Sequence, residues 1–180
     1  MLFRSTSHAI QYQAPLLRAM ARDNRLEIHV ALCSDQGARA YTDKGFGQEV
    51  KWDVPLLQGY DYEILRNFSP APNPSTFWGL INPGIISKIW SGDFDALMLH
   101  SWSNLTTWLA IFAAGVRGVP MVLRPEANIY APKRLGKAAV MKRWVLSNLF
   151  RRMGAILASG RYGVEFFRDY GALPDRKSVV

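Results

Sequence analysis

The chain has 180 residues, of which 49% are hydrophobic and 20% charged. This balance excludes an intrinsically disordered chain, and the length favours one domain with a single core. The longest apolar run, residues 108–116, is about half of the roughly 18 residues that a membrane span needs. The first residues contain no apolar stretch of the signal-peptide kind, so we expect a cytoplasmic location.

Positive charge is in excess, because 22 Lys and Arg residues face 14 acidic ones and give a formal net charge of +8. Such an excess indicates an anionic partner, which can be a phosphorylated substrate, an acidic lipid surface or nucleic acid. Nucleic acid is not expected, because no recognised nucleic-acid-binding motif accompanies the charge. Cys33 is the only cysteine and the three histidines lie apart, so the sequence predicts neither a disulfide nor a metal site.

Short apolar segments alternate with longer amphipathic ones along the chain. The short segments are typical of strands covered on both faces, and they predict strands at 2–4, 27–33, 94–99, 120–123 and 155–158. The longer segments predict helices at 11–22, 104–116, 135–153 and 161–170. We therefore expect an α/β fold: a single Rossmann-like, doubly wound and mostly parallel sheet with helices on both faces. Residues 36–78 are rich in Gly, Pro and aromatic residues and predict one or two short strands within a long excursion.

Polar residues follow four of the expected strands, at 5–8, 100–104, 124–126 and 159–161. Ligands of open α/β sheets bind beyond the carboxyl ends of the strands. The candidate substrate-binding residues are therefore Ser7, His8, His100, Trp102, Arg124, Glu126 and Ser159. In the alternative interpretation the hydroxyl groups only cap helices, His100 bonds to the backbone, and Arg124 pairs only with Glu126. No catalytic residue can be assigned.

A nucleotide cofactor is not expected either. A dinucleotide-binding fold needs G-x-G-x-x-G at the first strand–helix turn, because glycine lets the backbone approach the pyrophosphate. The first glycine of this chain is Gly37, well past that turn, and no P-loop lysine motif is present. These absences argue against a dehydrogenase or a nucleotide hydrolase.

The order and spacing of several segments together resemble the amino-terminal domain of family-4 glycosyltransferases, which have the two-domain GT-B fold. No single segment is specific, but the resemblance covers nearly the whole chain. The segments are 7–20 (SHAIQYQAPLLRAM), 34–47 (SDQGARAYTDKGFG), 50–62 (VKWDVPLLQGYDY), 82–85 (NPGI), 100–102 (HSW), 123–126 (LRPE) and 157–171 (LASGRYGVEFFRDYG).

This resemblance implies transfer of a sugar, with retention at the anomeric carbon, from a nucleotide sugar to a glycan or lipid-linked glycan acceptor. The nucleotide sugar would be a co-substrate held mainly by a carboxyl-terminal domain, and no further cofactor is implied. Residues 5–8 would face the donor phosphates, although the family often has glycine there and this chain does not. His100 and the segment 124–126 would line the acceptor side.

The main departure from the family concerns its carboxyl-terminal domain, which carries two glutamates separated by seven residues. No two glutamates of this chain have that spacing. We therefore expect residues 1–176 to form the acceptor-side domain and 177–180 to begin an interdomain linker, with the second domain absent or on a separate subunit. The chain alone is expected to be inactive, and Trp102 with the aromatic residues of 52–62 is expected to form an exposed docking face.

Two other functions stay open at this stage. One is a non-catalytic binding or scaffolding module, or a subunit of a split transferase. A different Rossmann-type enzyme acting alone is disfavoured by the missing glycine loop.

The expected helix at 135–153 is both basic and amphipathic. Ala138, Met141, Val145 and Leu149 recur at helical spacing and predict its buried stripe. One interpretation is a solvated surface helix; the other is peripheral attachment to the anionic inner face of a membrane. The residues proposed for that contact are Lys133, Arg134, Lys137, Lys142 and Arg143.

Overall fold

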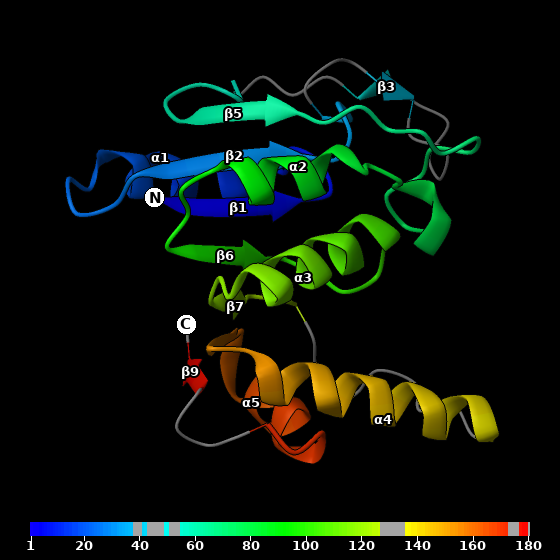
Figure 1. Cartoon of the computed structure of the whole chain (residues 1–180). Coiled ribbons are helices and arrows are strands. Elements are labelled where there is room, and N and C mark those ends of the chain that lie inside the picture. Colours follow the sequence, from blue (N-terminus) through cyan, green and yellow to red (C-terminus); the bar gives the residue numbers. More distant parts are fainter. Residues whose placement is uncertain (38–40, 43–48, 51–54, 127–135, 173–176, 180) are drawn as a thin grey trace.

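The computed structural model describes residues 1–37, 41–42, 49–50, 55–126, 136–172 and 177–179. Seven parallel strands form one sheet in the order β5-β2-β1-β6-β7-β8-β9 (Figure 1). The order runs outward from β1 in both directions, which is the doubly wound arrangement expected from the sequence. The strands are β1 (Leu2–Thr6), β2 (Ile28–Leu32), β5 (Asp61–Ile64), β6 (Ala96–Leu99), β7 (Met121–Leu123), β8 (Ala155–Ala158) and β9 (Lys177–Val179).

Helices cover both faces of this sheet, as predicted. In Figure 1, α2 and α3 lie in front of the strands, and α1 lies behind them. The helices are α1 (Ala14–Arg22), α2 (Gly84–Ser91), α3 (Leu105–Arg117), α4 (Lys137–Arg152) and α5 (Gly160–Asp169), with short 3₁₀ turns η1 (Gln11–Gln13) and η2 (Phe77–Gly79). Two further short strands, β3 (Tyr41–Thr42) and β4 (Glu49–Val50), pair with each other in an antiparallel ribbon.

Successive side chains of each strand point to opposite faces and so belong to different parts of the core. Phe3, Leu97 and Leu99 belong to the large hydrophobic cluster shared with α2 to α5. Val30 packs instead against Leu17 of α1, on the opposite face. Since Arg4 follows Phe3, its side chain points to the α1 face, where it contacts η1 and α1.

The helix α3 begins and ends where the sequence predicts. Asn104 is its N-cap, and its side-chain oxygen accepts a hydrogen bond of 2.9 Å from the backbone N–H of Thr107. Gly118 ends the helix in the left-handed conformation with φ of 77°, which an L side chain adopts only with strain. Local capping chemistry therefore sets both ends of this element.

Two elements differ from the sequence-based expectations. The helix α2 was not predicted, because its eight residues are too short to give a clear helical period. Residues 177–179 were expected to begin a linker, but they form β9, which pairs in parallel with β8. A three-residue strand is shorter than any pattern that alternation can reveal, and its place comes from pairing with a neighbour distant in sequence.

The helix α4 forms as predicted, but its expected buried stripe is confirmed only at Leu149. The buried residues are Leu146, Leu149 and Phe150, whereas Ala138 and Met141 are exposed. The physical reason is that only the second half of α4 packs onto the domain, while its first half projects away from it (Figure 1). Helical spacing identifies a face, but it does not tell how far along the helix that face is covered.

Candidate substrate site at the carboxyl edge of the sheet

The central strands end at a common edge. Ser5 of β1 is level with Leu99 of β6, and Leu99 is level with Leu123 of β7. The arrowheads of β5, β2, β1 and β6 point the same way in Figure 1. The residues that directly follow these strands, among them His100 and Arg124, therefore lie side by side at one edge of the sheet. The backbone N–H of Arg124 bonds to the carbonyl of Leu99 at 2.9 Å, which continues the pairing to this point.

A chain of hydrogen bonds on the α1 face joins three side chains from three elements. Arg4 is 0% exposed, and its Nη2 donates to Oε1 of Gln13 in η1 at 2.9 Å. The Nε2 of the same Gln13 amide lies 3.3 Å from Nδ1 of His100. The turn η1 thus places one amide between a strand guanidinium and a strand-end imidazole.

This cluster is electrically unusual. Burial, and then the neighbouring Arg124, lower the pKa of Arg4 to about 10. Burial, followed by the charges of Arg4 and Arg124, lowers the pKa of His100 to about 3, so this imidazole is neutral at physiological pH. Arg4 forms no ion pair with a carboxylate anywhere in the described part of the chain. The edge therefore carries positive potential around a neutral histidine.

Ser7 and His8 occupy the loop after β1. The Ser7 hydroxyl lies 2.9 Å from Nδ1 of His8, and Thr6 Oγ1 donates to the His8 carbonyl at 3.5 Å. Burial lowers the pKa of His8, so it also favours the neutral form. These two predicted residues are brought together at the expected edge, although no contact joins them to His100 among the described residues.

Arg124 and Glu126 lie beyond β7 as predicted. They form no ion pair with each other within the described ranges. The alternative interpretation, in which Arg124 pairs only with Glu126, therefore has no support. Glu126 is exposed and lies near Tyr12 of η1, whose pKa is raised first by burial and then by the Glu126 carboxylate. An exposed carboxylate and a buried cationic cluster therefore flank the same turn.

Trp102 and Ser159 are not brought into this cluster. The ring of Trp102 packs against Phe150, Phe166 and Phe167, on the face covered by α3 to α5. This corrects the expectation of an exposed aromatic docking surface at Trp102. Of the other aromatic residues in that prediction, Tyr62 is exposed, Tyr60 is half-buried, and Trp52 lies outside the described residues. Ser159 is the N-cap residue of α5, but its side chain makes no capping hydrogen bond and is exposed.

Sequence reasoning missed Arg4, Gln13 and Tyr12. The available signal was an arginine inside an otherwise apolar strand, since charged residues are almost never fully buried without a partner. Gln13 and Tyr12 gave no signal, because their role depends on how η1 folds over the strand ends.

Asn82 stiffens the same edge from the other face of the sheet. Its Nδ2 donates to the carbonyls of Cys33 and Leu65, at 2.9 and 3.0 Å. These carbonyls directly follow β2 and β5, so one buried amide ties two strand ends together. Cys33 itself is buried, and burial raises its thiol pKa to about 12.

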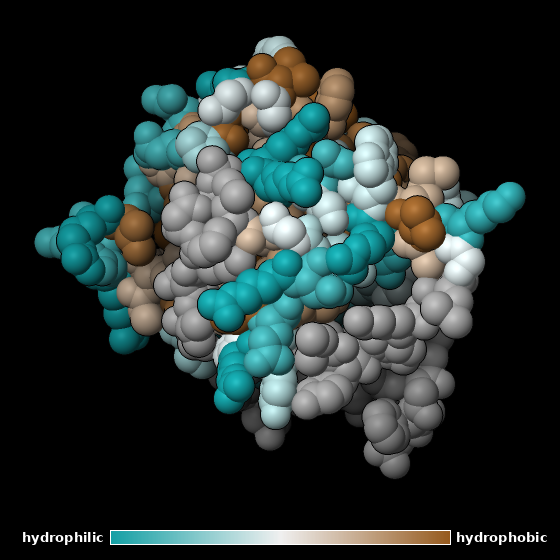
Figure 2. Space-filling view, turned by 90° about the horizontal axis from the view of Figure 1, so that it is seen from below, coloured by the Kyte–Doolittle hydropathy of each residue, from teal (hydrophilic) through white to brown (hydrophobic). Residues whose placement is uncertain are grey.

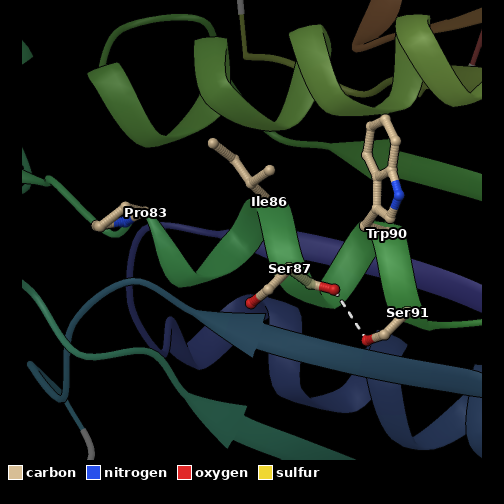
Figure 3. Close-up of a pocket in the computed structure, with 5 residues that line it drawn as sticks. All are labelled: Pro83, Ile86, Ser87, Trp90 and Ser91. Atoms are coloured by element: carbon tan, nitrogen blue, oxygen red, sulfur yellow. Dashed lines mark hydrogen bonds between the residues drawn. The ribbon is translucent and has the colours of Figure 1, made fainter.

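A shallow depression on α2 lies away from this edge and has a different character. It is lined by Pro83, Ile86, Ser87, Trp90 and Ser91 (Figure 3). The Ser91 hydroxyl is bonded to the Ser87 carbonyl at 2.8 Å, which satisfies it within the helix. Because all five residues come from one helix and its first turn, the depression offers no convergent polar groups for a substrate.

The first half of α4 exposes apolar side chains beside basic ones. Val140, Met141 and Trp144 are 70%, 66% and 66% exposed. Lys137 and Lys142 are exposed on the same turns. Figure 2 views the molecule from below Figure 1, where α4 and α5 lie, and shows separate hydrophobic residues among hydrophilic ones.

The five basic residues predicted to face a membrane have different environments or lie outside the described residues. Arg143 is engaged within the protein: its Nη1 bonds to the Asp169 carboxylate at 2.9 Å, and its guanidinium stacks over the Tyr170 ring. Lys133 and Arg134 lie outside the described residues. No helix in the part of the chain that the structure describes is long and apolar enough to cross a membrane. Over the same ranges, no three His, Cys, Asp or Glu side chains gather to hold a metal ion.

Comparison with known proteins identifies structural relatives only. Anabaena HepE in complex with UDP superimposes with a TM-score of 0.62 at 16% identity, covering 99% of this chain and 43% of that chain. Its complex with UDP-glucose gives a TM-score of 0.62 at 15% identity. UDP-N-acetylglucosamine 2-epimerase from Rickettsia bellii gives a TM-score of 0.57 at 12% identity, covering 99% and 44% of the two chains.

The likeness is one of fold. The chain has the fold of a GT-B half-domain, and it spans less than half the length of each of these proteins. No family model and no curated protein matches the sequence. Membership of glycosyltransferase family 4 therefore stays a prediction from the sequence.

Proposed function

We propose that this chain is the acceptor-binding, amino-terminal half of a retaining glycosyltransferase that uses a nucleotide sugar. The acceptor, a glycan or lipid-linked glycan, contacts the carboxyl edge of the sheet at His100, Arg124 and Glu126. Ser7 and His8 face the donor phosphates in the complete enzyme. Donor binding and the remaining catalytic groups belong to a second domain or subunit.

The observation that carries this proposal is the convergence of polar side chains at one edge of a GT-B half-domain. His100 and Arg124 follow adjacent strands, and Glu126 lies beside the turn that bonds to His100. Arg donors and a carboxylate acceptor are the groups that recognise sugar hydroxyls and phosphates. In support, the structural relatives include a protein solved with UDP-glucose bound.

Binding of the chain to an array of defined oligosaccharides, alongside a calorimetric titration with UDP-glucose, tests this proposal. We expect binding to a subset of glycans that weakens in Arg124→Ala, and little affinity for UDP-glucose. The matched control is Arg22→Ala, which removes an exposed arginine at the far end of α1. A chain that binds no glycan, or one that Arg124→Ala leaves unaffected, contradicts the assignment and favours a scaffolding module.

A second role, attachment to an anionic membrane surface, is favoured by one specific observation. The first half of α4 exposes Val140, Met141 and Trp144 beside Lys137 and Lys142. Apolar and aromatic side chains enter the interface of a bilayer, while neighbouring lysines attract acidic lipids. Such attachment would bring the domain to a lipid-linked acceptor.

A further inference from the structure

Two buried N–H groups at the carboxyl edge have no hydrogen-bond partner among the described residues. They are Nε of Arg4 and Nε2 of His100. Both side chains hydrogen-bond to the amide of Gln13, Arg4 through Nη2 and His100 through Nδ1, so they lie on the same face of the sheet. Unpartnered buried donors are rare in folded proteins, because each loses its hydrogen bonds to water.

The neighbouring hydrogen bonds fix the protonation of His100. A guanidinium can only donate, so the atom of Gln13 that faces Arg4 must be its oxygen. The amide nitrogen of Gln13 then faces His100 and donates to Nδ1. A neutral imidazole that accepts at Nδ1 carries its proton on Nε2. His100 is therefore held as an Nε2–H donor and not as a base.

The positive charge around these two donors favours a negatively charged hydrogen-bond acceptor as their partner. Arg4 is 0% exposed, and in the part of the chain described its side chain hydrogen-bonds to Gln13 and the Met20 sulfur and to no carboxylate. Arg124, directly after β7, adds a second positive charge that acts on both Arg4 and His100. Tyr12 of η1 is 58% exposed, and Glu126 beside it is also exposed. Solvent therefore screens the negative charge of Glu126. The buried cation lacks a buried anion.

We propose that Arg4, His100 and Arg124 form a binding site for an oxyanion, a phosphate or carboxylate carried by the acceptor. The Nε–H of Arg4 and the Nε2–H of His100 donate to its oxygens, and Gln13 is the positioning residue that holds both donors. Because both atoms are closed off from solvent, binding includes a local movement of the groups that cover them, while Gln13 keeps its bonds to Arg4 and His100. This inference rests on the proposed function for its ligand, but its test requires no sugar transfer.

Calorimetric titration of the 180-residue chain at low ionic strength tests the site, with inorganic phosphate and acetate as probes and glucose as the neutral control. We expect saturable binding of phosphate or acetate and none of glucose. Nitrogen-15 NMR of the histidine rings should show His100 as the Nε2–H tautomer, with its signal shifting on addition of the anion. Absence of binding by both anions, or a His100 proton on Nδ1, would overturn the proposal.

Two variants separate a binding role from a structural one. Arg4→Met should weaken anion binding about tenfold or more, because a hydrogen bond to a charged group is lost. It should also keep or raise the melting temperature, since an uncompensated buried charge is replaced by an apolar side chain. Gln13→Glu should likewise raise the melting temperature and abolish anion binding, because the new carboxylate pairs with Arg4. The control Arg22→Met should change neither property.

Several outcomes contradict the proposal. Loss of folding or a lower melting temperature in Arg4→Met, with anion affinity unchanged in Gln13→Glu, would make Arg4 a structural residue. A UDP arm separates the two phosphate sources: the acceptor assignment expects UDP to bind no more tightly than phosphate, and much tighter binding of UDP would assign the site to the donor. Glycan binding on the array without anion binding would leave the proposed function standing and remove only this inference.

Discussion

Burial of His100 links the stability of the domain to pH. Its pKa is lowered from 6.5 to about 3, so the folded protein keeps this imidazole neutral while the unfolded chain takes up a proton below pH 6.5. The stabilisation is thus fully present above the unfolded pKa and is lost as the pH falls from about 6.5 towards about 3. Between pH 7 and pH 5 the loss is about 2 kcal/mol.

We predict that His100→Gln, whose amide retains a donor, removes most of this pH dependence. Urea unfolding of the wild type and the variant at both pH values gives the difference in free energy directly. The background includes His8, whose pKa is also lowered and which contributes in the same direction in both proteins. Equal slopes of unfolding free energy against pH in the two proteins would mean that His100 titrates normally in the folded state.

Glu126 should matter for binding and not for stability. Its carboxylate is exposed and makes no ion pair among the described residues, so Glu126→Gln should change the melting temperature by less than about one degree. Binding to the glycans recognised on the array should weaken, because an acceptor of sugar hydroxyl protons is lost. The comparison is Glu27→Gln, an exposed carboxylate just before β2. A fall of several degrees with unchanged glycan binding would show that Glu126 is structural.

The strand-end rule predicted where these residues lie, but it could not predict which of them meet. His100 and Arg124 could be placed at one edge from the apolar strands before them. Trp102 lies only two residues beyond His100, yet its ring packs on the opposite face among Phe150, Phe166 and Phe167. The face on which each of these side chains lies depends on the direction in which the loop leaves the strand. Residue spacing in the sequence does not predict that direction.

The elements were predictable where local chemistry determines them. The helix expected at 104–116 agrees with α3, whose ends are set by the cap at Asn104 and the left-handed Gly118, and five of the sheet strands were expected from their apolar runs. Short elements were not: α2 and β9 exist because of neighbours that cover or pair with them. The extent of burial along α4 also depends on the domain beneath it, so the stripe predicted through Ala138 and Met141 was wrong.

The exposed start of α4 leads to a prediction for the proposed membrane contact. The chain should co-sediment with vesicles that contain phosphatidylglycerol and not with pure phosphatidylcholine, and high salt should release it. Each lysine near an anionic surface contributes about 1 kcal/mol, and salt screens this attraction. Replacing both Met141 and Trp144 with Gln should reduce the bound fraction several-fold, because the apolar contact is lost.

Phe112→Gln is the matched control, since this phenylalanine of α3 is also 66% exposed but has no basic helix around it. Its bound fraction should equal that of the wild type. Equal recovery on both kinds of vesicle, or unchanged recovery in the Met141 and Trp144 variant, would leave α4 as an ordinary solvated helix.

At the scale of the whole molecule, the fold corresponds to one half of a larger two-domain fold. The sheet, its doubly wound order and its polar carboxyl edge match one half of a GT-B protein, and the chain aligns with 43% of HepE. Sequence patterns predicted this architecture because five of its parallel strands, covered on both faces, are short continuous apolar runs.

The last prediction is that the 180-residue chain alone transfers no sugar from UDP-glucose to any glycan that it binds. Transfer requires donor and acceptor to be held together in a reactive geometry. A protein that holds only one of them loses most of the rate enhancement that comes from proximity. The site has hydrogen-bond donors for the proposed acceptor, but His100 is neutral, carries its proton on the buried Nε2 and is unsuited to act as a base. Release of UDP, followed with a coupled assay at saturating UDP-glucose, should equal the rate without protein. Glycan-dependent release of UDP that disappears in Arg124→Ala would show that the chain is catalytic by itself, and would place donor-binding groups on this same domain.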